Sequence, residues 1–146
     1  MKSIDPHRER VLDTDDPYVA KRLVEGRVVC VLHARSDRRG MQLESHPSRA
    51  VPAGQIHELA LTDDAEAAPG QRVDRVAYLG FVEIERGGVI LAGDRVTVGG
   101  RELGRVVGFD ETHYPNHMNI LLRGALWQTG RELGVEVEAS VGFARR

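Results

Sequence analysis

The sequence predicts a mainly β protein, a small antiparallel β-barrel preceded by one short N-terminal α-helix. From residue 72 onward, short runs rich in valine, isoleucine and leucine are separated by Gly-Gly, Gly-Asp, Arg-Gly and Leu-Gly pairs. Several short strands at such spacing are typical of barrels and sandwiches. The runs at 81–85 and 135–138 alternate strictly between apolar residues and glutamates, which indicates strands with one face in water.

Residues 1–26 are expected to form an arm and the helix. The arm is polar and has no periodicity, as chain termini often do. Asp16 then fits the N-cap, Pro17 the first helical position and Gly26 the residue that follows a helix. The predicted helix covers Tyr18–Glu25, about two and a half turns.

Residues 27–146 are expected to form a single barrel-like domain. The predicted strands are Val28–Leu32, Gln55–Leu61, Val73–Val76, Tyr78–Glu85, Val89–Leu91, Arg95–Val98, Leu103–Phe109, Met118–Leu122 and Val135–Val141. The first strand is a continuous apolar run that suits burial on both faces, and Cys30 within it is expected to be a buried small hydrophobe. A long connection at 34–52 and an exposed excursion at 62–70 interrupt the strands.

Composition indicates one soluble domain without a polyanionic partner. The length of 146 residues matches one ordinary domain with one core. Its 20 basic and 22 acidic side chains are interspersed and the formal net charge is −2, so neither nucleic acid nor a membrane is expected as a partner.

The N-terminal sequence and the single cysteine favour a cytoplasmic location. The first thirty residues contain no apolar run, so neither a signal peptide nor a spanning helix is expected. One cysteine cannot form an intramolecular disulfide, which fits a reducing compartment. Strands striped with glutamate at a sheet edge gain from being covered, which favours a homodimer.

The segment Phe109–Asn119 carries more chemistry than a chain reversal requires. A turn needs only glycine, asparagine or aspartate at its tip, whereas this segment holds two of the six histidines, two carboxylates and two carboxamides. Clustered titratable groups are candidates for function. The candidate catalytic residues are His117, His113 and Glu111, and the candidate substrate-binding residues are Asn116, Asn119, Tyr114, Arg35 and Arg39.

Three interpretations of this segment stay open: exposed loop residues with no function, a metal site, and a metal-free polar pocket. His113 and His117 have the spacing of helical zinc motifs, but Pro115 disfavours helical geometry at Tyr114. A metal would then need Asp110 or Glu111 as third ligand, and we expect no metal and no cofactor. Carboxamides are poor ligands for transition metals and good at orienting hydroxyls and carboxylates, which favours the pocket.

Two further groups of residues could extend the pocket. His33 and His57 end or interrupt other predicted strands, and either one meeting His117 across a barrel mouth would enlarge the site. Arg35 or Arg39, on the long connection, would recruit an anionic group. Nucleotide phosphate loops and nucleophile elbows are absent from the sequence.

The leading functional hypothesis is therefore a small-molecule enzyme or binding protein of bacterial metabolism. Its ligand would be a small polar or anionic molecule. If it is catalytic, His117 would transfer protons while Asn116 or Asn119 orients the substrate, as in isomerase, lyase or cyclase chemistry. A divalent-metal-dependent enzyme that uses His113 and His117 is an alternative.

The segment Gly88–Gly100, followed by Leu103–Gly108, carries a resemblance to a known family. An apolar strand, a Gly-Asp turn, a hairpin and a further strand lead to a final apolar strand preceded by a histidine, here His117. Residues 75–124 thus resemble the glucitol/sorbitol-specific IIA component of the bacterial sugar phosphotransferase system.

What the resemblance implies is a small β-barrel scaffold without phosphotransfer. In that family the phosphate-carrying histidine would lie in the strand before the hairpins, and the corresponding Arg75–Phe81 contains no histidine. The second alternative function is therefore a non-catalytic regulatory or interaction module on an IIA-like scaffold.

Overall fold

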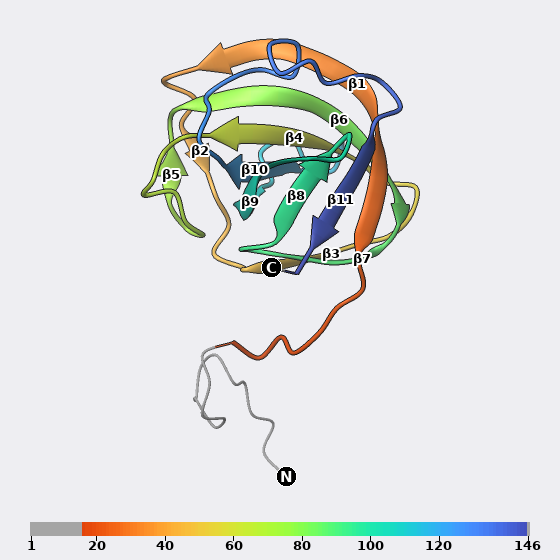
Figure 1. Cartoon of the computed structure of the whole chain (residues 1–146). Coiled ribbons are helices and arrows are strands. Elements are labelled where there is room, and N and C mark those ends of the chain that lie inside the picture. Colours follow the sequence, from red (N-terminus) through yellow and green to blue (C-terminus); the bar gives the residue numbers. More distant parts are fainter. Residues whose placement is uncertain (1–15, 146) are drawn as a thin grey trace.

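Seven strands form a closed barrel in the order β1-β11-β8-β9-β10-β4-β6 (Figure 1). The computed structural model describes residues 16–145. Its strands are β1 (Val24–Ser36), β2 (Met41–Gln42), β3 (Ser48–Val51), β4 (Ile56–Thr62), β5 (Arg72–Val73), β6 (Val76–Arg86), β7 (Gly88–Leu91), β8 (Arg95–Val98), β9 (Arg101–Asp110), β10 (Asn119–Arg123) and β11 (Ser140–Ala144). The prediction of a mainly β protein is confirmed.

Six of the seven neighbouring pairs in the barrel are antiparallel, and the pair β4–β10 is parallel. The prediction of an antiparallel barrel was therefore wrong for this one pair. Two small sheets, β2–β5 and β3–β7, lie outside the ring on the left and at the bottom of Figure 1. Closure leaves the ring without an open edge, so no barrel strand needs a partner chain to cover it. The homodimer stays a prediction.

The interior is filled by side chains that alternate along each strand. Leu59 and Leu61 of β4 and Ile120 and Leu122 of β10 belong to the main core, which also contains Phe109. The residues between them face outward. On this outer wall a second, smaller core forms under the segment 37–75, from Met41, Leu43, Ala60, Ala67, Val73, Val76, Val107 and Leu121. The long connection, and the excursion that was predicted to be exposed, therefore partly form a second layer over the barrel.

The N-terminal helix prediction was wrong. Residues 16–23 have no regular secondary structure, and β1 begins at Val24, where it pairs with Phe143 of β11. A helix of two to three turns is marginal on its own, and its capping residues do not stabilise it enough. Pairing with β11 stabilises the strand conformation from Val24 onward instead. The predicted arm at 1–14 lies outside the described residues. Among residues 16–145 no helix is long and apolar enough to cross a membrane.

A buried ion pair fixes this N-terminal segment to the barrel. The Lys21 ammonium lies 2.8 Å from Asp94 Oδ2 and donates to the carbonyls of Val89 and Phe143 at 2.8 and 3.1 Å. Asp94 is fully buried and also accepts a hydrogen bond from the Leu91 N–H. One lysine thus joins β7, the turn between β7 and β8, and β11.

Two other predictions near the barrel wall were wrong. Cys30 is exposed, because β1 has one face in water and a register shift against β6 follows Val28. The alternating run 135–138 is not a strand: Val137 is 55 % exposed and Glu138 has a positive φ of 75°. This run turns the chain into β11, which begins at Ser140.

Candidate functional site

A row of four side chains crosses neighbouring strands on the outer wall of the barrel. Phe81 of β6 pairs with Glu58 of β4, Glu58 with Asn119 of β10, and Asn119 with Asp110 of β9. Residues directly opposite on paired strands project from the same face. Two carboxylates and the carboxamide between them, which we call the polar row, therefore stand side by side next to the second core.

The polar row is buried although it faces outward. Asn119 is 0 %, Asp110 2 % and Glu58 9 % exposed. Asn119 Nδ2 donates to Asp110 Oδ2 at 2.8 Å, and the N–H and hydroxyl of Thr112 donate to Asp110 Oδ1 at 3.3 and 2.6 Å. The Arg39 guanidinium lies 3.6 Å from Asp110 Oδ2. Asp110 is thus well supplied with donors, while Asn119 Oδ1 is buried with no hydrogen-bond partner among the described residues.

His117 lies over Glu58 at the end of the histidine-bearing loop. Its Nε2 is 3.5 Å from Glu58 Oε1, beyond a normal hydrogen bond, and has no other partner in the described part of the chain. Its Nδ1 lies 2.7 Å from Asn116 Nδ2. With that amide nitrogen donating, the proton of the neutral ring is on Nε2 and points toward Glu58. The ring meets Phe81 edge to face at 5.0 Å and lies 5.2 Å from the His113 ring.

Burial moves the pKa values of Glu58 and His117 toward each other. Burial raises the pKa of Glu58, and the Asp110 charge adds to this while His113 and Arg39 oppose it. Burial lowers the pKa of His117, against the pull of Asp110. The contact has the distance of an ion pair, yet desolvation disfavours both charges, so we take neutral His117 to be the form that faces Glu58 near neutral pH. Converging pKa values of this kind suit a proton-transfer pair.

Arginines hold the two flanks of the polar row. Arg39 Nε donates to the Tyr78 hydroxyl at 2.5 Å, and burial raises the pKa of that hydroxyl. On the other flank, Arg49 forms an ion pair with Glu111 and lies over the Tyr114 ring at 5.3 Å. Tyr114 is 51 % exposed. Glu111 and Tyr114 therefore brace the loop rather than enter the row.

His57, next to Glu58 in the chain, fixes the base of the loop. Its Nδ1 accepts from the Met118 N–H at 3.0 Å, and its Nε2–H donates to Gln55 Oε1 at 2.8 Å. Burial lowers the pKa of His57 and the charge of Arg49 adds to this, as would a proton on His117. Both ring nitrogens are satisfied only in the neutral form, so His57 holds the loop in place.

The structure brings together most but not all of the predicted site residues. His113, His117, Asn116, Asn119 and Arg39 lie in or beside the polar row. Arg35 does not: it pairs with Glu132 at 2.6 Å and lies over the ring of Trp127. His33 is likewise remote and bonds to Thr129 Oγ1 at 2.9 Å.

Sequence analysis missed Glu58, which is central to the site. It lies inside the predicted strand Gln55–Leu61, in which only His57 was considered for the site. The available signal was its alternation with Ala60 and Thr62, which puts a glutamate on the same face as two small residues.

The arrangement offers proton transfer and polar binding rather than a set of metal ligands. Among residues 16–145 no group of three or more histidine, cysteine, aspartate and glutamate side chains is placed to hold a metal ion. Of the two possible third ligands, Glu111 is turned toward Arg49 and Asp110 accepts hydrogen bonds from Asn119 and Thr112.

Fold and site together define a small β-barrel with a buried polar row on its outer wall, closed over by a histidine-bearing loop. The chain belongs to the family of unknown function DUF6917, whose model matches residues 18–144. No curated protein and no solved structure matches the chain. The resemblance to the glucitol/sorbitol-specific IIA component therefore stays a prediction.

Proposed function

We propose that the polar row binds a small polar or anionic hydroxy-carbonyl compound and transfers a proton on it, in isomerase, lyase or cyclase chemistry. The observation that carries this is the contact between the buried carboxylate of Glu58 and His117. The two atoms Oε1 and Nε2 are 3.5 Å apart, and the Nε2–H has no normal hydrogen bond among the described residues. Asn119 Oδ1 adds an unsatisfied buried acceptor on the neighbouring strand. Unsatisfied buried polar atoms cost stability, and such a cost is often retained where a ligand supplies the missing partner.

The unsatisfied atoms suggest the chemical class of the ligand. A carbonyl oxygen would accept from His117 Nε2–H, and an adjacent hydroxyl would donate to Asn119 Oδ1. Glu58 would then remove the C–H proton from the hydroxyl-bearing carbon next to the carbonyl, while the histidine N–H stabilises the negative charge on the carbonyl oxygen. In an isomerisation Glu58 returns this proton to the former carbonyl carbon, and the hydroxyl proton moves to the former carbonyl oxygen. Glu58 replaces His117 as the preferred proton-transfer residue, because the proton of His117 already faces the carboxylate.

Recognition of an anionic substituent is assigned to Arg39. Its guanidinium is 19 % exposed and adjoins Asp110 of the row. A ligand would reach the row past residues 112–116, which are all exposed, so the loop would act as a lid. The proposal includes a cytoplasmic location, supported by the single free cysteine.

The test is proton exchange with solvent. Wild-type protein in D₂O is incubated with a panel of small α-hydroxy aldehydes, α-hydroxy ketones and their acid derivatives, and C–H loss is followed by NMR. Exchange of at least one compound is expected, and Glu58→Gln is expected to slow it about 100-fold or more.

The matched control is Glu85→Gln, which removes a carboxylate that is 48 % exposed on β6 and should leave exchange unchanged. Circular dichroism and melting curves verify that both variants fold. Failure of every compound to exchange, or a Glu58→Gln rate within twofold of wild type, contradicts the proposal.

A further inference from the structure

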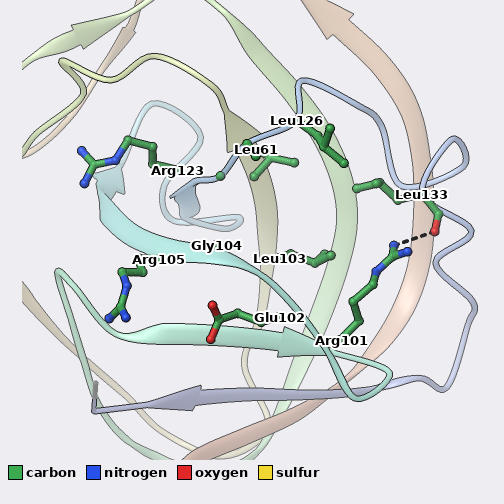
Figure 2. A pocket seen from close by; sticks show the side chains of 11 residues that line it. Leu61, Arg101, Glu102, Leu103, Gly104, Arg105, Arg123, Leu126 and Leu133 are labelled. Carbon is green, nitrogen blue, oxygen red and sulfur yellow. Dashed lines mark hydrogen bonds between the residues drawn. The ribbon is translucent and has the colours of Figure 1, made fainter.

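We propose a second binding site, for an amphipathic carboxylate of the acyl-chain type, at the opposite end of β4 and β10 from the polar row. A pocket of about 420 Å³ opens there, between the C-terminal end of β4, the start of β9 and the segment that follows β10 (Figure 2). This volume is within the roughly 300–1,000 Å³ of small-molecule sites. None of its lining residues belongs to the polar row.

The floor of this pocket, which we call the leucine pocket, is apolar. Leu61 comes from the buried core at 1 % exposure, and Leu103 and Leu133 are partly buried against that core. Leu126 stands at the rim and is 50 % exposed. Figure 2 shows these four side chains around one hollow. A hydrocarbon chain seated there would shield leucine surface that water now contacts.

Three arginines also line the leucine pocket, and each is bound only to a backbone carbonyl. Arg101 donates to the Leu133 carbonyl at 2.7 Å, Arg105 to that of Gly93 at 3.1 Å, and Arg123 to that of Ala67 at 2.9 Å. A carbonyl orients a guanidinium but does not neutralise its positive charge. Within residues 16–145 no carboxylate pairs with any of the three, and Glu102 beside them lies 3.9 Å from Arg95.

The carboxylate of the ligand would bind at Arg101. A second pocket of about 280 Å³ adjoins the first and shares Arg101 and Leu133 with it. The hydrogen bond between these two residues therefore stands at the junction, and Figure 2 shows Arg101 reaching toward Leu133 there. A carboxylate at this junction would replace the neutral Leu133 carbonyl as the acceptor for Arg101 and form a charge-assisted pair with it. The hydrocarbon chain of the ligand would then extend over the leucines. Apolar lining and unpaired positive charge together select an amphipathic anion over a purely polar one.

Binding of sodium decanoate, measured by isothermal titration calorimetry on the full chain, tests the site. Trp127, the only tryptophan, directly follows Leu126, so its fluorescence provides a second readout. Saturable binding near one equivalent is expected. Decanol, which lacks the charge, and acetate, which lacks the chain, are each expected to bind at least about tenfold more weakly.

Arg101→Gln is expected to weaken decanoate binding about tenfold or more and to leave decanol binding unchanged. Arg38→Gln is the matched control, because that side chain is 94 % exposed and carries the same charge. Leu126→Asn should weaken decanoate and decanol alike. Absence of decanoate binding up to about 1 mM, acetate binding as tight as decanoate binding, or an unaffected Arg101→Gln variant would each overturn the proposal.

Discussion

Replacing Lys21 by methionine is expected to destabilise the protein strongly. The substitution keeps an unbranched side chain and removes the ammonium group that faces Asp94. Both side chains are buried, with 8 % exposure for Lys21 and 0 % for Asp94, so water cannot take the place of the lost partner. The carbonyls of Val89 and Phe143 lose a donor at the same time.

The expected cost is about 3–5 kcal/mol, the usual penalty for leaving one member of a buried ion pair without its partner. For a domain of this size each kcal/mol lowers the melting temperature by about 2–4 °C, so the melting temperature should fall by roughly 6–20 °C. The double variant Lys21→Met/Asp94→Asn removes the stranded charge and should recover most of the loss.

Urea unfolding followed by circular dichroism measures these differences. A lower midpoint at an unchanged slope identifies a loss of stability without a change in the surface exposed on unfolding. Arg86→Met is the surface control, since its 3.7 Å pair with Glu25 is half exposed and should be worth less than about 1 kcal/mol. A cost below about 1 kcal/mol for Lys21→Met, or no recovery in the double variant, would refute the reasoning.

Two further predictions concern the polar row and its base. Burial lowers the pKa of His57 below its ordinary 6.5, so on acidification the unfolded chain binds this proton before the folded chain does. The contribution of neutral His57 to the free energy of unfolding is therefore complete above pH 6.5 and is lost as the pH falls through the pKa of the folded state. The urea midpoint should therefore fall between about pH 7.5 and 5.5, and it should fall less in His57→Gln; equal slopes would contradict this. Asn119→Asp inserts a third carboxylate between Glu58 and Asp110 and should cost about 3 kcal/mol at neutral pH, with the cost shrinking on acidification because the introduced group binds its proton more tightly in the folded state. Asn116→Asp, on the exposed loop, should stay within about 0.5 kcal/mol of wild type by urea unfolding, and a loss at position 119 that small would count against the polar row.

Local pattern predicted the strands where the barrel needs little beyond β-branched residues and turns. Arg95–Val98 was predicted with the observed bounds, and the strand at 88–91 within one residue. The helix at 18–25 and the strand at 135–141 failed for the same reason. Their cap and alternation signals were genuine, but partners distant in sequence decided where β1 and β11 begin.

The candidate site, too, was predicted mainly where its residues are adjacent in sequence. The loop from Glu111 to His117 stood out because its unusual residues are adjacent in sequence. Glu58 did not, because its importance comes from Asn119 and His117, which reach it only through the β4–β10 pairing and the loop above it. The leucine pocket was also hidden, because its lining comes from β4, β9 and the segment after β10, and the sequence does not show that these meet.

The parallel β4–β10 pair has a topological origin. A closed ring with an odd number of strands cannot alternate direction all the way round, so at least one neighbouring pair must run the same way, and in this seven-stranded ring it is β4 and β10. The connections that precede both strands therefore meet above the polar row, and those that follow both strands leave from the leucine-pocket end. Each end of this one pair can thus change its loops by insertion or substitution while the strand register, and with it the other end, is preserved.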